Sequence, residues 1–181
     1  MQPKTKHLAL GAAFGLAILV LILLLVVVWV AYSGTYNIAA TQGHQPFVRW
    51  TLVTTMKNSV TDRAEAITTP SLSDERVTAG ATGYKSMCQH CHGGPGVRQS
   101  EWARGMLPEP PHLPDAISEW EPSEVFWLAK HGIRMSGMPA FGPTHSDDEI
   151  WNITAFAMRL PGMTEDEYAS FETAGSTDHG H

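Results

Sequence analysis

An uninterrupted apolar segment near the N-terminus constrains this 181-residue chain more than any other feature. The 23 residues from Leu8 to Val30 carry no charged side chain. At about 1.5 Å per residue, a helix of this length crosses a hydrocarbon core of about 30 Å. The competing interpretation is a cleaved signal peptide, whose apolar region normally spans about 7 to 15 residues. The longer run favours a retained anchor, and residues 1–33 are therefore predicted to form a transmembrane helix.

Residues at the two ends of this segment predict its orientation. Lys4 and Lys6 precede it together with the N-terminal amine, whereas Trp29 and Tyr32 stand at its far end. Positive charge is retained on the cytoplasmic side of a membrane, and Trp and Tyr prefer its interfaces. We therefore expect a single-pass protein of the cytoplasmic membrane, with the long C-terminal part on the periplasmic side.

Acidic residues outnumber basic ones in the exported part. The 12 basic residues less Lys4 and Lys6 leave 10, against 18 acidic residues, a formal net charge of −8. Such a surface argues against nucleic acid as a partner, because phosphate backbones attract basic patches. It favours either docking to a protein with a basic patch, with an attraction that salt weakens, or solubility alone. The sequence leaves these two interpretations open.

Residues 34–70 are predicted to link the anchor to the folded domain. The stretch from Pro46 to Ile67 has a helical pattern, because Pro46 suits a first helical turn and apolar residues follow at helical spacing. These apolar residues are Phe47, Trp50, Val53, Met56 and Val60. The resulting amphipathic helix would rest either on the bilayer surface or a partner subunit, or on the folded domain as a spacer.

Residues 71–163 are predicted to form a domain of helices without any strand pattern. Ser73, followed by two acidic residues, is typical of a helix N-terminus, and this helix should run into Cys88. Ser146, followed by three acidic residues, caps a final helix that ends near residue 160. A short helix is also expected at 122–130, where an apolar run is closed by a glycine.

The loops of this region are long and rich in glycine and proline. Four prolines fall between Pro108 and Pro114, and a second loop covers residues 132–143. This composition suits neither a regular helix nor a central strand, and long irregular loops in compact domains commonly wrap a ligand. A large apolar cofactor would account for them. Residues 164–181 are acidic and are expected to form a short helical turn followed by a flexible tail.

The two cysteines of the chain stand in the run Cys88-Gln89-His90-Cys91-His92. This C-x-x-C-H spacing is that of c-type haem attachment. The two thiols add to the haem vinyl groups as thioethers, and the adjacent histidine then lies under the porphyrin with a ring nitrogen toward iron. We therefore predict one covalent haem c, attached through Cys88 and Cys91 and ligated by His92.

Three other chemistries use cysteines at this spacing. A thioredoxin-like redox pair needs a βαβ setting, which the surrounding sequence lacks. A structural zinc site needs a second pair of ligands, and His112, His131 and His145 are not spaced as one. A disulfide suits an exported protein but leaves His92 and the irregular loops unexplained. Haem attachment accounts for all of these features together.

The second axial ligand is expected in the loop at 132–143, which contains two methionines. A thioether sulfur is a soft, neutral donor that raises the potential of haem iron. Met138 is the predicted ligand, because Gly137 permits a close approach of the backbone and Pro139 restricts the chain that follows. Met135 would then pack in the core or at the haem edge.

Together these motifs resemble those of class I cytochromes c, in particular the bacterial membrane-anchored type with one haem. The likeness covers about residues 71–163. The run Gly80-x-x-x-Tyr84-x-x-x-Cys88 resembles the N-terminal helix of the family, whose glycine lets a C-terminal helix cross closely. Gly137–Phe141 resembles its distal ligand loop, and Pro108–Pro114 resembles its proline-rich haem-packing loop.

The resemblance implies an all-α fold wrapped around the haem. It implies that Phe156 or Trp151 packs at the helix crossing, and that the carbonyl of Pro110 or Pro111 accepts a hydrogen bond from His92. Some further residues are either partners of the haem propionates or ordinary surface and core residues. These are Arg98, Trp102, Arg104 and Trp120.

The function implied by the resemblance is electron transfer between redox proteins of a respiratory chain. With His92 and Met138 both on iron, no position is left for a substrate, and we expect neither catalytic residues nor enzyme activity. Two alternatives stay open. One is a fixed haem subunit of a dehydrogenase or terminal oxidase complex, and the other is a haem enzyme or gas sensor with a vacant sixth position. The sequence does not identify the donor or the acceptor.

Overall fold

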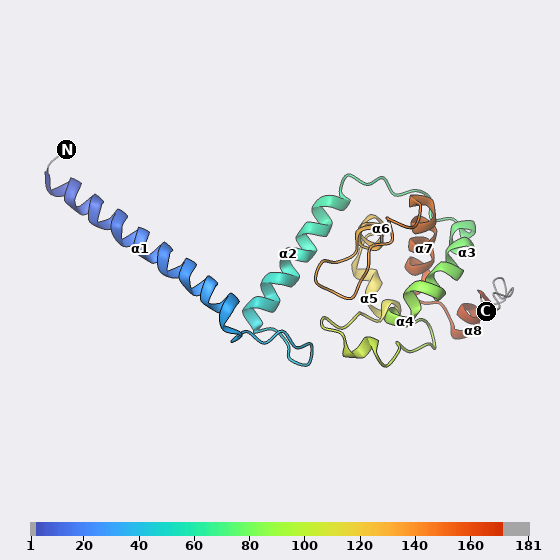
Figure 1. The fold of residues 1–181 in the computed structure, drawn as a ribbon. Helices are drawn as coiled ribbons and strands as arrows, with labels where there is room; N and C mark the ends of the chain where they lie inside the picture. The colour runs from blue at the N-terminus through green and yellow to red at the C-terminus, as the bar shows by residue number, and fades with distance from the viewer. Residues whose placement is uncertain (1–2, 172–181) are drawn as a thin grey trace. The chain divides into compact units, whose positions relative to one another are not determined.

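The computed structural model describes residues 3–171 of the chain. These residues fall into two compact units that divide between Gln42 and Gly43. The first unit holds one long helix, and the second holds all the other helices described (Figure 1). The part of the predicted tail at 172–181 lies outside the described residues.

Helix α1, Pro3–Ser33, contains the predicted membrane span. Its segment Lys6–Ser33 is 28 residues long and apolar enough to cross a bilayer, and no part of its most hydrophobic window is buried inside the protein. A helix that is apolar on all sides needs lipid or protein to cover it. The structure thus agrees with one N-terminal transmembrane helix.

The second unit is built from helices and short helical turns joined by loops. In chain order its elements are α2 Pro46–Ala64, α3 Asp74–Gly83, the π-helical turn η1 Tyr84–Cys88, α4 Gln89–His92, the 3₁₀ turn η2 Ala103–Gly105, α5 Leu113–Ala116, the 3₁₀ turn η3 Ile117–Glu119, α6 Pro122–His131, α7 Asp147–Arg159 and α8 Glu165–Ser170. Within residues 3–171 there is no strand, so the all-α prediction is confirmed.

Helix α7 lies between α3 and α6, and α2 packs on α6 (Figure 1). The main buried cluster joins α3, η1 and α7, with the fully buried side chains of Tyr84, Phe156 and Tyr168 at its centre. A smaller cluster around Phe126, Ile150 and Trp151 lies between α6 and α7. The larger buried cluster therefore lies beside the Cys88–His92 segment.

Helices α3 and α7 cross at Gly80. A Cβ atom at this position would lie 1.9 Å from the backbone carbonyl oxygen of Asn152, so the approach requires glycine. Beside the crossing, the rings of Tyr84 and Phe156 meet with their centroids 5.4 Å apart. Of the two aromatic residues that the family resemblance offered, the structure selects Phe156. Trp151 instead stacks on an aromatic ring of α6, with the centroids 4.1 Å apart.

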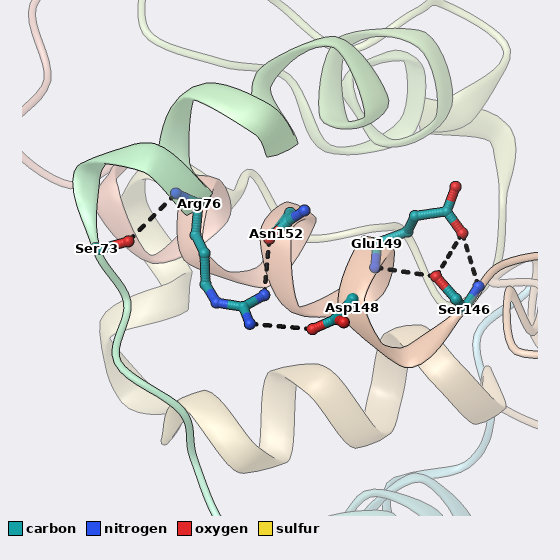
Figure 2. A network of polar contacts seen from close by, with 6 residues as sticks. All are labelled: Ser73, Arg76, Ser146, Asp148, Glu149 and Asn152. Carbon is teal, nitrogen blue, oxygen red and sulfur yellow. Dashed lines mark hydrogen bonds and ion pairs between the residues drawn. The ribbon is translucent and has the colours of Figure 1, made fainter.

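Polar contacts hold the same pair of helices together on its exposed side (Figure 2). Arg76 of α3 donates to the side-chain oxygen of Asn152 at 2.8 Å and to the carboxylate of Asp148 at 3.0 Å. The N-termini of both helices are capped as predicted, because the hydroxyls of Ser73 and Ser146 each accept from the backbone N–H three residues on. Local sequence signals therefore set where α3 and α7 begin.

The second half of α2 packs on the rest of its unit. Val60 and Ala64 are buried, and the hydroxyl of Thr61 donates to the carboxylate of Glu124 in α6 at 2.6 Å. Lys57 lies 3.8 Å from a carboxylate of η3. The predicted helix is thus present, and of the two positions weighed for it, packing on the domain holds for this half. The first half remains exposed.

The glycine at the helix crossing is directly testable. Gly80→Ala would place a methyl group against the backbone of Asn152, and overpacking of this kind costs about 1–3 kcal/mol. We expect the free energy of unfolding of the holoprotein, measured by guanidinium titration with far-UV circular dichroism, to fall by that amount. Gly105→Ala is the control, because a Cβ there meets nothing within 4 Å. Equal stability of the two variants would contradict the close crossing.

Candidate functional site

The Cys88–His92 segment follows directly from α3. After Gly83 the helix widens into the π-helical turn η1, and α4 then carries the second cysteine and the histidine. Helix α4 ends at Gly93, where φ is +68° and a Cβ atom would lie 2.5 Å from the ring of His112. Glycine is required here on both counts. The C-x-x-C-H residues therefore form one continuous helical stretch with a sharp exit.

Cys88 and Cys91 are not joined by a disulfide. Burial raises the pKa of Cys88 to about 12 and also raises the pKa of Cys91. Redox-active C-x-x-C pairs work through a thiol whose pKa is lowered. The shift in the opposite direction argues against thioredoxin-like chemistry at this site.

The imidazole of His92 is oriented by the proline-rich loop. Its Nδ1 lies 2.9 Å from the carbonyl oxygen of Pro111. A carbonyl only accepts, so Nδ1 carries the proton and Nε2 is left in the form that binds a metal. The structure thereby selects Pro111 over Pro110 as the residue facing the histidine. Burial lowers the pKa of His92, and the bond to Pro111 acts in the opposite sense.

A glutamine that was not predicted from the sequence ties this loop to the Cys88–His92 segment. The side-chain Nε2 of Gln99 donates to the carbonyl oxygens of both Cys91 and Pro110, each at 2.7 Å. The bridge places the proline loop beside the histidine that it orients. No sequence signal distinguishes Gln99 from any other polar loop residue, because its role depends on segments brought together by folding.

The hydroxyl groups of two tyrosines form hydrogen bonds to the helical stretch that carries the cysteines and His92. Tyr84 donates from its hydroxyl to the carbonyl oxygen of Gly93 at 2.9 Å, which ties the start of η1 to the end of α4. The hydroxyl of Tyr168, from α8, donates to the side chain of Gln89 at 2.6 Å. The contribution of Tyr168 was not anticipated, because the sequence placed it in a tail expected to be mostly flexible.

The loop at 132–143 separates its two methionines. Met135 has φ +60° and a side chain that is 94% exposed, whereas Met138 is half-buried. The backbone N–H of Met138 donates to the hydroxyl of Ser136, and its carbonyl accepts from the N–H of Ile133. At Gly132, φ is +64° and a Cβ atom would strike Met138 and Pro139. These contacts hold Met138, whereas Met135 is exposed and does not pack in the protein core, one of the two positions predicted for it.

The three histidines weighed as zinc ligands have ordinary local partners. His112 pairs with Asp115, His145 contacts Thr144, and His131 lies on the ring of Trp127. Across the described residues, no group of three His, Cys, Asp or Glu side chains is arranged to hold a metal ion. This finding argues against the zinc alternative.

The four suggested propionate partners lie in varied surroundings. Arg104 is exposed and pairs with Glu101 at 3.8 Å, Trp102 and Arg98 are exposed, and Trp120 lies under Lys57. These positions fit ordinary surface residues as well as propionate partners.

Comparison with known families gives the segment its identity. Residues 75–156 match the family model described as cytochrome C oxidase, cbb3-type, subunit III. These residues form a cytochrome c domain. Searches among curated proteins and among solved structures returned no significant match. As a cytochrome c domain it carries covalently bound c-type haem iron and transfers electrons, and helix α1 is long and apolar enough to anchor the protein in a membrane.

The side chains of the cytochrome c domain fit such a haem. Two cysteines not joined by a disulfide, and a histidine with a defined tautomer, stand within one helical stretch. Several half-buried apolar side chains belong to neither buried cluster and are available to line a porphyrin. They are Met106, Trp127, Leu128, Ile133 and Met138, and their partial burial is the observation that makes them candidates for contact with the haem.

Buried Tyr84 predicts a dependence of stability on alkaline pH. Burial raises the pKa of Tyr84 well above its ordinary value near 10. The stability that depends on the neutral phenol is therefore complete below about pH 10 and is lost as the pH rises above it. Tyr84→Phe should lower the free energy of unfolding at pH 7 by about 1 kcal/mol, through the lost bond to Gly93.

As the pH rises from about 9 to about 11, the free energy of unfolding of Tyr84→Phe should fall by less than that of the wild type. This range brackets the ordinary pKa of tyrosine. Guanidinium titrations followed by far-UV circular dichroism measure both effects. Tyr32→Phe, at an exposed position, is the control and should behave as the wild type. An unchanged alkaline slope in Tyr84→Phe would contradict the role given to its burial.

Proposed function

We propose that this protein carries single electrons between redox partners on the outer side of the cytoplasmic membrane. The haem is attached through Cys88 and Cys91, and its iron is bound by His92 and Met138. The observation that carries the proposal is the bond from His92 Nδ1 to the carbonyl oxygen of Pro111, in a segment of C-x-x-C-H sequence within a cytochrome c domain. This hydrogen bond keeps the proton on Nδ1, so Nε2 is the one ring nitrogen that can bind a metal.

Each ligand has a distinct task in this proposal. The two thioethers keep the haem on the chain, so that it is not lost between encounters. His92 is held by Pro111, and indirectly by Gln99, in one tautomer and one orientation. Bound haem iron supplies a one-electron couple. If His92 and Met138 both bind the iron, no position on it would be left for a substrate, which favours electron transfer over catalysis.

Met138 is the proposed sixth ligand on two structural grounds. Its backbone is held through Ser136 and Ile133, and its side chain is half-buried. The side chain of Met135 is 94% exposed. A neutral thioether favours ferrous iron, so this ligand would raise the reduction potential.

Met138→Ala should open the sixth position of the iron. The reduced variant should bind carbon monoxide, the oxidised variant should lose the weak sulfur-to-iron absorption in the red, and the potential should fall. Absorption spectroscopy and redox titration of the purified holoprotein measure these three effects.

Met135→Ala is the matched control and should leave all three properties unchanged. Reversed outcomes would move the assignment to Met135. If neither substitution had an effect, a histidine ligand would replace methionine in the proposal.

The outer location is supported by the ends of the membrane helix. Lys4 and Lys6 lie in the first turns of α1, before its apolar segment, and Trp29 and Tyr32 lie near its other end. In this arrangement residues 34–70 form an extracytoplasmic linker, and residues 71–163 form the haem domain. Partners would then be redox proteins of the respiratory chain.

Topology is tested with the full chain in its own membrane. Protease added to spheroplasts should release a soluble haem-containing fragment, because the domain faces outward. Inside-out vesicles serve as the control and should keep that fragment protected. Protection in spheroplasts together with release from inverted vesicles would reverse the proposed orientation.

A second candidate role is a fixed haem subunit of a larger complex. It is favoured by the description of the matched family, which names a subunit of an oxidase. Native electrophoresis of membranes solubilised in mild detergent separates the two roles, because a fixed subunit migrates with its partners and a tethered carrier migrates alone. A haem enzyme or gas sensor would instead require the iron to bind carbon monoxide in the unaltered protein.

A further inference from the structure

The first two turns of α2 carry an exposed apolar surface. Phe47 is 74% exposed, Trp50 is 62% exposed, and Leu52 and Val53 are 52% and 41% exposed. The rings of Phe47 and Trp50 lie against each other, with their centroids 5.9 Å apart. These apolar residues cover the N-terminal end of the helix rather than one stripe along it. We call residues 46–53 the apolar end of α2.

The apolar end is rigidly connected to the haem domain. It continues without a break into the second half of α2, where Val60 and Ala64 are buried and Thr61 bonds to Glu124. Burying the apolar end against the rest of its own unit would therefore break the contacts between α2 and α6. Whatever covers this surface comes from outside the unit.

Chain length keeps the apolar end near the membrane. Only twelve residues, 34–45, separate the last residue of α1 from the first of α2. Fully extended, they would span about 40 Å at 3.3 to 3.6 Å per residue. A turn closed by the bond from Gln42 N–H to the carbonyl of Ala39 shortens that reach. The first residue of the apolar end therefore lies within this distance of the last residue of α1.

Charge along the chain also favours lipid at this end. No acidic residue precedes Asp62. Of the four basic residues before it, Lys4 and Lys6 lie at the cytoplasmic end of α1 in the proposed topology, so Arg49 and Lys57 are the two that lie on the same side as the apolar end. All 18 acidic residues and the other 8 basic ones lie from Asp62 onward, which gives that part a formal net charge of −10. An anionic bilayer repels the acidic part of the chain and attracts the part that contains the apolar end.

We propose that the apolar end of α2 lies in the interfacial layer of the membrane that α1 crosses. Tryptophan and phenylalanine favour this layer, and the single charge of the segment, Arg49, is suited to lipid phosphates. Attachment at a second point restricts the rotation of the haem domain about its tether. The haem domain would then meet its partners in the membrane with a limited set of orientations.

Labelling of single cysteines tests this contact. Cys88 and Cys91 are the only cysteines of the chain, and in the holoprotein both are blocked by haem, so an introduced cysteine is the one free thiol. Phe47→Cys and Trp50→Cys probe the apolar end, and Thr55→Cys and Asn58→Cys are exposed controls on the same helix. Full-length holoprotein is reconstituted as one copy per lipid nanodisc and treated with a charged maleimide.

We expect the two probe positions to react about tenfold more slowly in nanodiscs than the two controls, after each rate is normalised to the unfolded chain. Equal rates at all four positions would overturn the proposal. Protection in native membranes but not in lipid-only nanodiscs would also overturn it, because the covering partner would then be a protein.

Linear dichroism of the haem tests the same contact without introduced cysteines. In oriented bilayers the haem absorption of the wild type should show linear dichroism, because attachment at two points limits rotation. The double substitution of Phe47 and Trp50 by Ser should abolish the dichroism and leave the haem spectrum unchanged. The control, with Thr55 and Asn58 both replaced by Ala, should retain it. Dichroism that survives loss of both aromatic residues would refute the second attachment, whatever the outcome of the electron-transfer tests.

Discussion

The contact between Gly80 of α3 and the backbone of α7 determines the position of the haem-attachment segment. Helix α3 continues through η1 into α4, so the packing of α3 on α7 sets the position of the two cysteines and His92. Backbone-to-backbone packing leaves no side chain that can adjust, and Arg76 holds the crossing on its outer side. The wider π-helical turn then re-aims the chain at Cys88, as such turns often do at functional sites.

Loops, rather than helices, complete the site. The carbonyl of Pro111 orients His92, and Gln99 holds the loop that carries this carbonyl. Burial lowers the pKa of His92 and so favours the neutral imidazole, which is the form that ligates a metal. The irregular chain at 132–143 holds Met138 through backbone hydrogen bonds. Irregular chain can follow the outline of a planar group, which a straight helix cannot do.

Charge and apolar surface are distributed unevenly along the chain, and this distribution separates the part suited to solvent from the part suited to lipid. The acidic part of the chain suits a soluble face that meets basic partners, whereas the acid-free part contains the anchor and the apolar end of α2. Helix α2 joins the two, because its second half is packed on α6 and its first half is exposed. An electron-transfer domain constrained in this way would search for partners mainly within the plane of the membrane.

Sequence alone determined the features that depend on neighbouring residues. The C-x-x-C-H spacing, the apolar run of α1, and the Ser73 and Ser146 caps are local, so they could be read without a structure. Folding decided what depends on distant segments: Phe156 rather than Trp151 at the crossing, Pro111 rather than Pro110 at the histidine, and the bridge made by Gln99. The ligand role of Met138 stays a prediction, supported by the exposure of the competing methionine. In each of these pairs the local sequence favours neither residue, and only contacts between distant segments distinguish the two.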